Sequence, residues 1–126
     1  MSLRRAVSGA LFLSCLIAIP AGAAPQPPDQ IRLHVRNGVI EVSWIKSPDD
    51  PLDVAGYEVV RGVFTTGPFQ SVCTTIKGAI SCCDRNAQPE KTYYYKVRAL
   101  GYADAGHSEF TPVVEGELPT PPVASR

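Results

Sequence analysis

The residues best suited to chemistry in this sequence are its cysteines, of which there are four. Cys15 falls inside an apolar N-terminal run, which leaves Cys73, Cys82 and Cys83 for the rest of the chain. In an oxidising compartment two of these three should pair. If residues 77–78 form a two-residue turn, Cys73 faces Cys82 at a non-hydrogen-bonded position of the ladder, where side chains approach most closely.

We therefore predict a Cys73–Cys82 disulfide with Cys83 as a free thiol. A register shifted by one residue gives Cys73–Cys83 instead, and a vicinal Cys82–Cys83 bridge or no bridge also remain open. A free Cys83 could join another chain or react, or it is a half-buried thiol without a role. Zinc is not expected, because the cysteines lack a second ligand pair and His34 and His107 lie far away in the sequence.

Carboxylates form the other cluster with chemical potential. Asp49, Asp50 and Asp53 could offer oxygen ligands to calcium. Their spacing fits no calcium loop and Pro51 interrupts it, so a solvated loop is the better interpretation. The chain has no serine-centred nucleophile motif and no Gly-rich phosphate loop. We therefore predict no catalytic residue, no cofactor and no metal, which makes the protein a non-enzyme.

Residues 1–23 are typical of a removable secretory signal peptide. Two arginines precede an apolar run at residues 10–19, which is too short to span a bilayer about 30 Å thick. Small residues follow, and we place the cleavage between Ala23 and Ala24. Lipidation at Cys15, a twin-arginine signal and an uncleaved anchor are the alternatives. The sequence thus predicts a secreted or periplasmic protein with no membrane span after cleavage.

The charge balance argues against one class of partner. The chain has 12 basic and 12 acidic residues, and removing the two leader arginines leaves 10 − 12 = −2. Nucleic-acid binding therefore lacks its electrostatic driving force. About a hundred mature residues suit one domain with one core.

Short segments with a period of two predict an all-β domain. Asn37-Gly38 is a strong hairpin turn signal between the first two of these segments. The expected strands cover residues 31–36, 40–44, 57–60, 69–73, 80–83, 93–99 and 110–114. We divide the chain into the leader, a Pro-rich lead-in at 24–29, a domain at 30–117 and a disordered Pro-rich tail at 118–126.

Alternate residues of these strands can fill one core between two sheets. The predicted core is centred on four aromatic residues. They are Trp44, Tyr57, Tyr93 and Tyr95. The predicted inward aliphatic residues are Ile31, Leu33, Ile40, Val42, Val59 and Val97.

The order of these elements resembles the fibronectin type III family, from about residue 27 to residue 117. The resemblance rests on a Pro-rich entry, a strand closing on Ser43-Trp44, and the run Asp53-Val54-Ala55-Gly56-Tyr57-Glu58-Val59-Val60-Arg61. It continues with Asp84, Pro89-Glu90-Lys91-Thr92-Tyr93, Tyr95-x-Val97 and Gly106-His107-Ser108.

The resemblance implies a seven-stranded immunoglobulin-like (fibronectin type III) β-sandwich. It also implies that Tyr93 is a corner tyrosine whose hydroxyl bonds to nearby backbone. Two positions depart from the family pattern, because Ala87 stands where Leu is usual and Glu90 where Gly is usual. These departures predict looser packing in that turn.

The expected role is that of a non-catalytic module for protein–protein interaction or structural spacing in the cell envelope or extracellular space. A carbohydrate-binding accessory protein, a thiol or redox protein using Cys83, and a subunit of an envelope complex are the alternatives. Exposed Tyr94 and Tyr102, with Val60 and Phe64, are the aromatic contact face considered for a partner.

Overall fold

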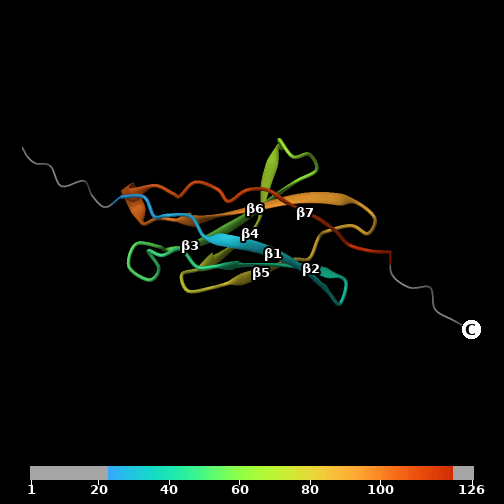
Figure 1. The fold of residues 1–126 in the computed structure, drawn as a ribbon, viewed down its shortest axis with the longest axis horizontal. Helices are drawn as coiled ribbons and strands as arrows, with labels where there is room; N and C mark the ends of the chain where they lie inside the picture. Colours follow the sequence, from blue (N-terminus) through green and yellow to red (C-terminus); the bar gives the residue numbers. More distant parts are fainter. Residues whose placement is uncertain (1–22, 121–126) are drawn as a thin grey trace, which may run out of the picture.

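The computed structural model describes residues 23–120, which fold into two packed antiparallel sheets (Figure 1). The strands are β1 (Asp29–Arg36), β2 (Val39–Ile45), β3 (Gly56–Gly62), β4 (Phe69–Ile76), β5 (Ser81–Asp84), β6 (Thr92–Leu100) and β7 (Val114–Glu117), with a short 3-10 helix η2 (Ala103–Ala105). One sheet has the order β1-β2-β5 and the other β4-β3-β6-β7. Within the described residues, no helix is long and apolar enough to cross a membrane.

The first hairpin forms as its turn residues predict. Arg36 pairs with Val39 across the turn, and the turn residues Asn37 and Gly38 have φ angles of 52° and 76°. A two-residue turn with positive φ at both positions matches the right-handed twist of the strands it joins. This turn fixes which residues of β1 and β2 face the other sheet.

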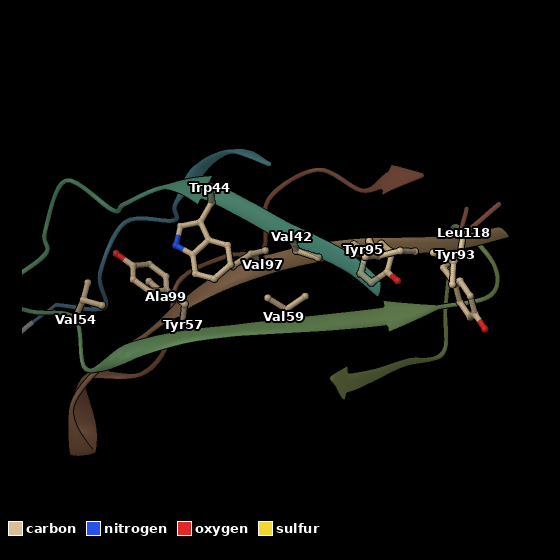
Figure 2. Close-up of a cluster of buried hydrophobic side chains, with 11 residues drawn as sticks. Val42, Trp44, Val54, Tyr57, Val59, Tyr93, Tyr95, Val97, Ala99 and Leu118 are labelled. Atoms are coloured by element: carbon tan, nitrogen blue, oxygen red, sulfur yellow. The ribbon is translucent and has the colours of Figure 1, made fainter. Parts of the chain in front are cut away.

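The four predicted core aromatics are buried between the sheets (Figure 2). Tyr57 and Tyr95 are fully buried, and the ring centroids of Trp44 and Tyr57 lie 5.4 Å apart. The Trp44 Nε1–H donates to the carbonyl of Ala79 at 3.1 Å, so its polar atom is satisfied inside the fold. The Tyr93 hydroxyl accepts from the Gln88 N–H at 3.0 Å, which is the geometry of a tyrosine corner.

The aliphatic part of the core also follows the predicted alternation. Ile40, Val42, Val59 and Val97 are at most 1% exposed, and Val54, Ala99 and Leu118 complete the cluster. Ile31 and Leu33 on the edge strand β1 are only half-buried and pack against its side. The core is therefore closed by the central strands and only partly covered by β1.

The predicted hairpin between residues 69 and 83 is wrong. Strand β4 pairs with β3 and strand β5 pairs with β2, so the two strands lie in different sheets. Lys77 and Gly78 do turn the chain, but they lead it from one layer to the other. Two strands joined by a turn give the same local sequence pattern whether they form a hairpin in one sheet or lie in different sheets. Only the pairing of β4 with β3 and of β5 with β2 decides between these two arrangements.

The last strand begins later than residues 110–114 predict. Thr111 and Ser108 use their side chains there, because their hydroxyls accept the Val97 and Ala99 N–H groups at 3.0 and 2.8 Å. These bonds hold the segment against β6 in place of a regular ladder. Pro112, which has no N–H to donate, follows at once, and β7 starts at Val114.

The domain extends further than the predicted boundary at residue 117. Leu118 is 5% exposed, and its carbonyl accepts the Glu90 N–H at 2.8 Å. The first residue of the predicted tail therefore belongs to the core. In the lead-in, Pro25 and Pro28 are buried. The predicted leader up to residue 22 and residues 121–126 lie outside the described residues, so the cleavage between Ala23 and Ala24 stays a prediction.

Candidate interaction surface

One end of the sandwich exposes a group of large aliphatic side chains. Leu52 in the β2–β3 loop is 82% exposed, and Ile76 at the end of β4 is 79% exposed. Ile45 at the end of β2 and Ile80 beside the β4–β5 turn are 52% and 56% exposed. We call these four residues the apolar end. Because exposed apolar surface is unfavourable in water, a group of this kind is typical of a surface that another molecule covers.

Hydrogen bonds join the segments that carry the apolar end. The Gly78 N–H donates to Oδ2 of Asp50 at 2.8 Å, and Lys77 Nζ donates to the Pro51 carbonyl at 3.3 Å. The Trp44 N–H donates to the Ile80 carbonyl at 2.9 Å, which ties the turn to β2. The β2–β3 loop and the β4–β5 turn therefore adjoin at the end of the molecule that lies on the left in Figure 1.

Tyr57 anchors this loop to the core. Its hydroxyl donates to the same Oδ2 of Asp50 at 2.8 Å and accepts from the Ser47 N–H at 3.0 Å. Burial of the ring, and then the hydrogen bond to Asp50, raises the pKa of Tyr57 above its ordinary value of 10.0. The hydroxyl thus keeps its proton, and with it the bond that it donates to Asp50, to a higher pH than an exposed tyrosine would.

Two of the three carboxylates of the β2–β3 loop accept hydrogen bonds from the protein's own backbone. Oδ2 of Asp49 accepts the Gln26 N–H at 2.8 Å, Asp50 holds the turn and Tyr57, and Asp53 is exposed. Among residues 23–120, no group of three or more His, Cys, Asp or Glu side chains is placed to hold a metal ion. This arrangement is that of a hydrogen-bonded, solvated loop.

The aromatic contact face considered from the sequence does not form. Val60 is 6% exposed, and Tyr94 on the neighbouring strand is half-buried. Phe64 and Tyr102 follow opposite ends of the β3–β6 ladder, since Gly62 pairs with Tyr94 and Gly56 with Leu100. The four side chains are therefore not one surface.

The outer face of the four-stranded sheet instead carries alternating aromatic and cationic side chains. Lys96 Nζ lies 4.1 Å from the ring centroid of Phe69 and 4.5 Å from that of Phe110. Arg98 Cζ lies 4.8 Å from the Phe110 centroid, and its NH2 group pairs with Oε1 of Glu58 at 2.8 Å. Lys96 and Arg98 therefore cover part of the surface of these rings.

A buried ionic cluster, which the sequence pattern did not reveal, joins the two sheets. Asp84 of β5 is 2% exposed, and its Oδ2 accepts from Arg61 of β3 and from the Tyr95 hydroxyl of β6, each at 2.7 Å. The Arg61 guanidinium also lies 4.5 Å from the Tyr93 ring centroid. Burial, and then the bond to Asp84, raises the pKa of Tyr95 above its ordinary value of 10.0.

The cysteines pair as predicted, although by another geometry. Cys73 and Cys82 form a disulfide with a Cα–Cα distance of 6.7 Å, and Cys83 is the free, half-buried thiol among the described cysteines. The bridge joins β4 of one sheet to β5 of the other rather than two strands of one hairpin. The disulfide therefore links an edge strand of one sheet to an edge strand of the other.

The histidines lie on the surface of the domain. His34 is exposed opposite Glu41, and His107 is exposed opposite Leu100. Nδ1 of His107 accepts the Gly101 N–H at 3.4 Å. In the three-stranded sheet, His34 and Cys83 therefore lie in one cross-strand row with Glu41 between them.

A pocket of about 320 Å³ lies at the other end of the sandwich. Its lining includes Val35 of β1, Ala87 and Pro89 of the β5–β6 loop, and Leu118. Ala87 stands where the fibronectin type III pattern usually has Leu, so the smaller side chain leaves part of this space unfilled. The looser packing expected for this turn stays a prediction.

Comparisons of the sequence with protein-family models and with curated proteins found no match. Comparison with solved structures found a Fn3-like protein from Clostridium thermocellum, with 18% identity and a TM-score of 0.63, covering 80% of this chain and 100% of that chain. The fn3 domain of the human collagen alpha-1(XX) chain has 22% identity and a TM-score of 0.63, covering 86% of this chain and 96% of that chain.

The chain has the fibronectin type III fold. The twitchin kinase region from C. elegans also matches, with 17% identity and a TM-score of 0.64, covering 77% of this chain and 17% of that chain. Identities at this level establish the fold and carry no partner from one protein to another.

Sequence reasoning missed the apolar end and the ionic cluster for different reasons. Leu52 was visible as a lone aliphatic residue in a loop of Pro and Asp, which is a signal for an exposed anchor. Ile76 and Ile80 were assigned to a hairpin, which hid their exposure. Asp84 follows a strand directly and looks like a solvated turn residue, so no local signal predicted its burial against Arg61.

Proposed function

We propose that the protein is an exported, non-catalytic module of fibronectin type III fold that binds a partner protein through its apolar end. The observation that carries this proposal is the exposure of Leu52, Ile76, Ile80 and Ile45, which ranges from 52% to 82% on two adjoining segments. Burial of one such side chain contributes about 1.5–3 kcal/mol. A partner that covered this surface would gain a substantial apolar contact.

The rigidity of this end supports the same role. Asp50 fixes the β4–β5 turn through Gly78 and the β2–β3 loop through Tyr57, whose ring is fully buried. A loop that is already ordered loses little conformational entropy when a partner binds. The apolar end is therefore suited to present its side chains in one fixed arrangement.

The path of the chain supports a spacing role alongside binding. In Figure 1 the described chain begins at one end of the sandwich and finishes at the opposite end. A segment attached beyond residue 120 would then be held away from the apolar end by the length of the sheets. Such a module positions the apolar end at a set distance from whatever follows it in the cell envelope or extracellular space.

Site-specific photo-crosslinking tests the binding surface. A photoreactive amino acid at position 52 or 76 should give a crosslinked product of defined mass in cells that express the protein. The matched control is position 64, because Phe64 is 63% exposed but lies in the β3–β4 loop. With the photoreactive amino acid kept at position 76, Leu52→Ser combined with Ile80→Ser should abolish the product. Equal crosslinking from position 64, or none from positions 52 and 76, contradicts the proposal.

Processing and export need a separate measurement. We expect the mature protein to be recovered outside the cytoplasm with Ala24 as its first residue. N-terminal sequencing and cell fractionation measure both points. A cytoplasmic protein that keeps residues 1–23 would contradict export while leaving the binding surface to the crosslinking experiment.

A further inference from the structure

The geometry of the disulfide alone does not explain why Cys73 pairs with Cys82 and not with the adjacent Cys83. Cys82 and Cys83 are neighbours on β5, and both lie near the turn that leads from β4. Successive side chains of a strand point to opposite faces of the sheet. Cys82 crosses to Cys73 of the other sheet, whereas Cys83 pairs with Glu41 of β2 and stays half-buried. The register of β5 therefore decides which cysteine is bridged.

Asp84 holds that register. Of the two residues of β5 that point between the sheets, Cys82 carries the disulfide and Asp84 carries the bonds to Arg61 and Tyr95 at 2.7 Å each. Oδ1 of Asp84 also accepts the Asn86 N–H at 3.1 Å, which fixes the chain just after the strand. The carboxylate is 2% exposed, so it is committed to these partners.

We propose that Asp84 is a register lock that selects Cys82 over Cys83 as the disulfide partner of Cys73. A slip of β5 by one residue turns every side chain to the other face. It would bring Cys83 toward Cys73 but move Asp84 to the outer face, which leaves Arg61 and Tyr95 without their acceptor. Two hydrogen bonds with a charged partner thus oppose the slip.

The exchange that the lock prevents is chemically simple. The Cys83 thiolate would attack Sγ of Cys73, a Cys73–Cys83 bond would form, and the Cys73–Cys82 bond would break. Sγ of Cys82 would leave as a thiolate and take up the proton that Cys83 had lost. The step needs no oxidant or reductant, so register alone separates the two isomers. This inference is independent of the proposed function, because it concerns β5 and not the apolar end.

Cysteine variants of the full chain, produced in an oxidising compartment, test the lock. Cys82→Ser leaves Cys73 and Cys83, and we expect both to remain free thiols when they are counted after denaturation in the presence of an alkylating agent. In the matched control Cys83→Ser, neither Cys73 nor Cys82 should be a free thiol, because the native bridge between them forms. If Cys82→Ser forms the Cys73–Cys83 bridge as completely as the control forms its own, the proposal is wrong.

A second experiment removes the Asp84 carboxylate that is proposed to hold the register of β5. Adding Asp84→Ala to Cys82→Ser should raise the ratio of bridged to free Cys73–Cys83 at least tenfold, as peptide mapping without reduction would measure. Tyr95→Phe in the same background removes one of the two bonds and keeps the ring. It should raise the ratio by a smaller factor while the circular-dichroism spectrum stays that of a β-protein.

The milder variant keeps the test decisive if Asp84→Ala unfolds the chain. In that case the Tyr95→Phe ratio decides alone, because it is measured in a folded protein. An unchanged ratio in folded Tyr95→Phe and in folded Asp84→Ala overturns the lock. A rise in both, larger for Asp84→Ala, supports it.

Discussion

Filling the pocket beside Ala87 should stabilise the domain. The pocket of about 320 Å³ is lined by Ala87, Val35 and Leu118, and it is roughly ten times the volume that one water molecule takes in the liquid. Ala87 is half-buried and already packs against the core. Replacing it with Leu restores the residue usual at this place in the fibronectin type III pattern, and the space is large enough to avoid overpacking.

The size of the gain follows from the atoms added. Leu has three more carbon atoms than Ala, and each buried CH₂ contributes about 0.8 kcal/mol, which gives about 2.4 kcal/mol for full burial. Ordering the longer side chain costs about 0.5–1 kcal/mol. We therefore expect Ala87→Leu to raise the free energy of unfolding by about 1–2 kcal/mol.

Urea denaturation with the disulfide intact measures this change. At a slope of about 1–3 kcal/mol per molar urea, the midpoint should rise by about 0.3–2 M with the slope unchanged. Ala87→Ser is the control, because it adds a hydroxyl to an apolar pocket and should give no gain. Leu118→Ala should cost about 2–5 kcal/mol, since it removes a core side chain from the same lining. An unchanged or lowered midpoint for Ala87→Leu would refute the reasoning.

Three further outcomes are expected. Asp84→Ala should lower the free energy of unfolding by about 3–5 kcal/mol, because Arg61 loses its buried partner. Tyr95→Phe should lower it by about 1.5–3 kcal/mol, because one hydrogen bond to the carboxylate is lost. A loss below about 1 kcal/mol for Asp84→Ala in urea denaturation would contradict a stabilising role for the ionic cluster. The folded pKa values of Tyr57 and Tyr95 are raised, so their contribution to stability should be fully present below the unfolded tyrosine pKa of 10.0 and be lost as the pH rises above it. Tyrosinate absorbance should show that these two residues ionise only as the chain unfolds. Their titration near pH 10 in the folded protein would contradict this expectation. Trp44 is 4% exposed, so iodide should quench its fluorescence poorly until the protein unfolds, and efficient quenching of the folded protein would place the ring outside the core.

Local signals predicted much of the fold because they act over a few residues. Asn37 and Gly38 tolerate positive φ, so they set the first hairpin and its register wherever the strands go next. The alternation at residues 93–99 predicted the burial of Tyr93, Tyr95 and Val97, because a strand beside a core has only two faces to offer.

No local sequence pattern predicted the contacts between segments that lie far apart in the sequence. The segments around Cys73 and Cys82 were compatible with a hairpin or with two sheets, and the correct pair was predicted by a route that the fold does not use. The late start of β7 depends on the hydroxyls of Ser108 and Thr111 reaching β6, which only the packed structure brings about. The pairing of strands across the sandwich settles such questions, since each strand satisfies its backbone with whichever neighbour the core places beside it.

The sequence by itself determined the all-β character of this protein, its central aromatic residues and its first turn, because periodicity and turn chemistry are properties of neighbouring residues. The tertiary structure alone decided that Asp84 meets Arg61 inside the protein, and that Leu52 and Ile76 share one exposed end. These contacts join residues from different strands and loops, and their positions exist only once the two sheets have packed.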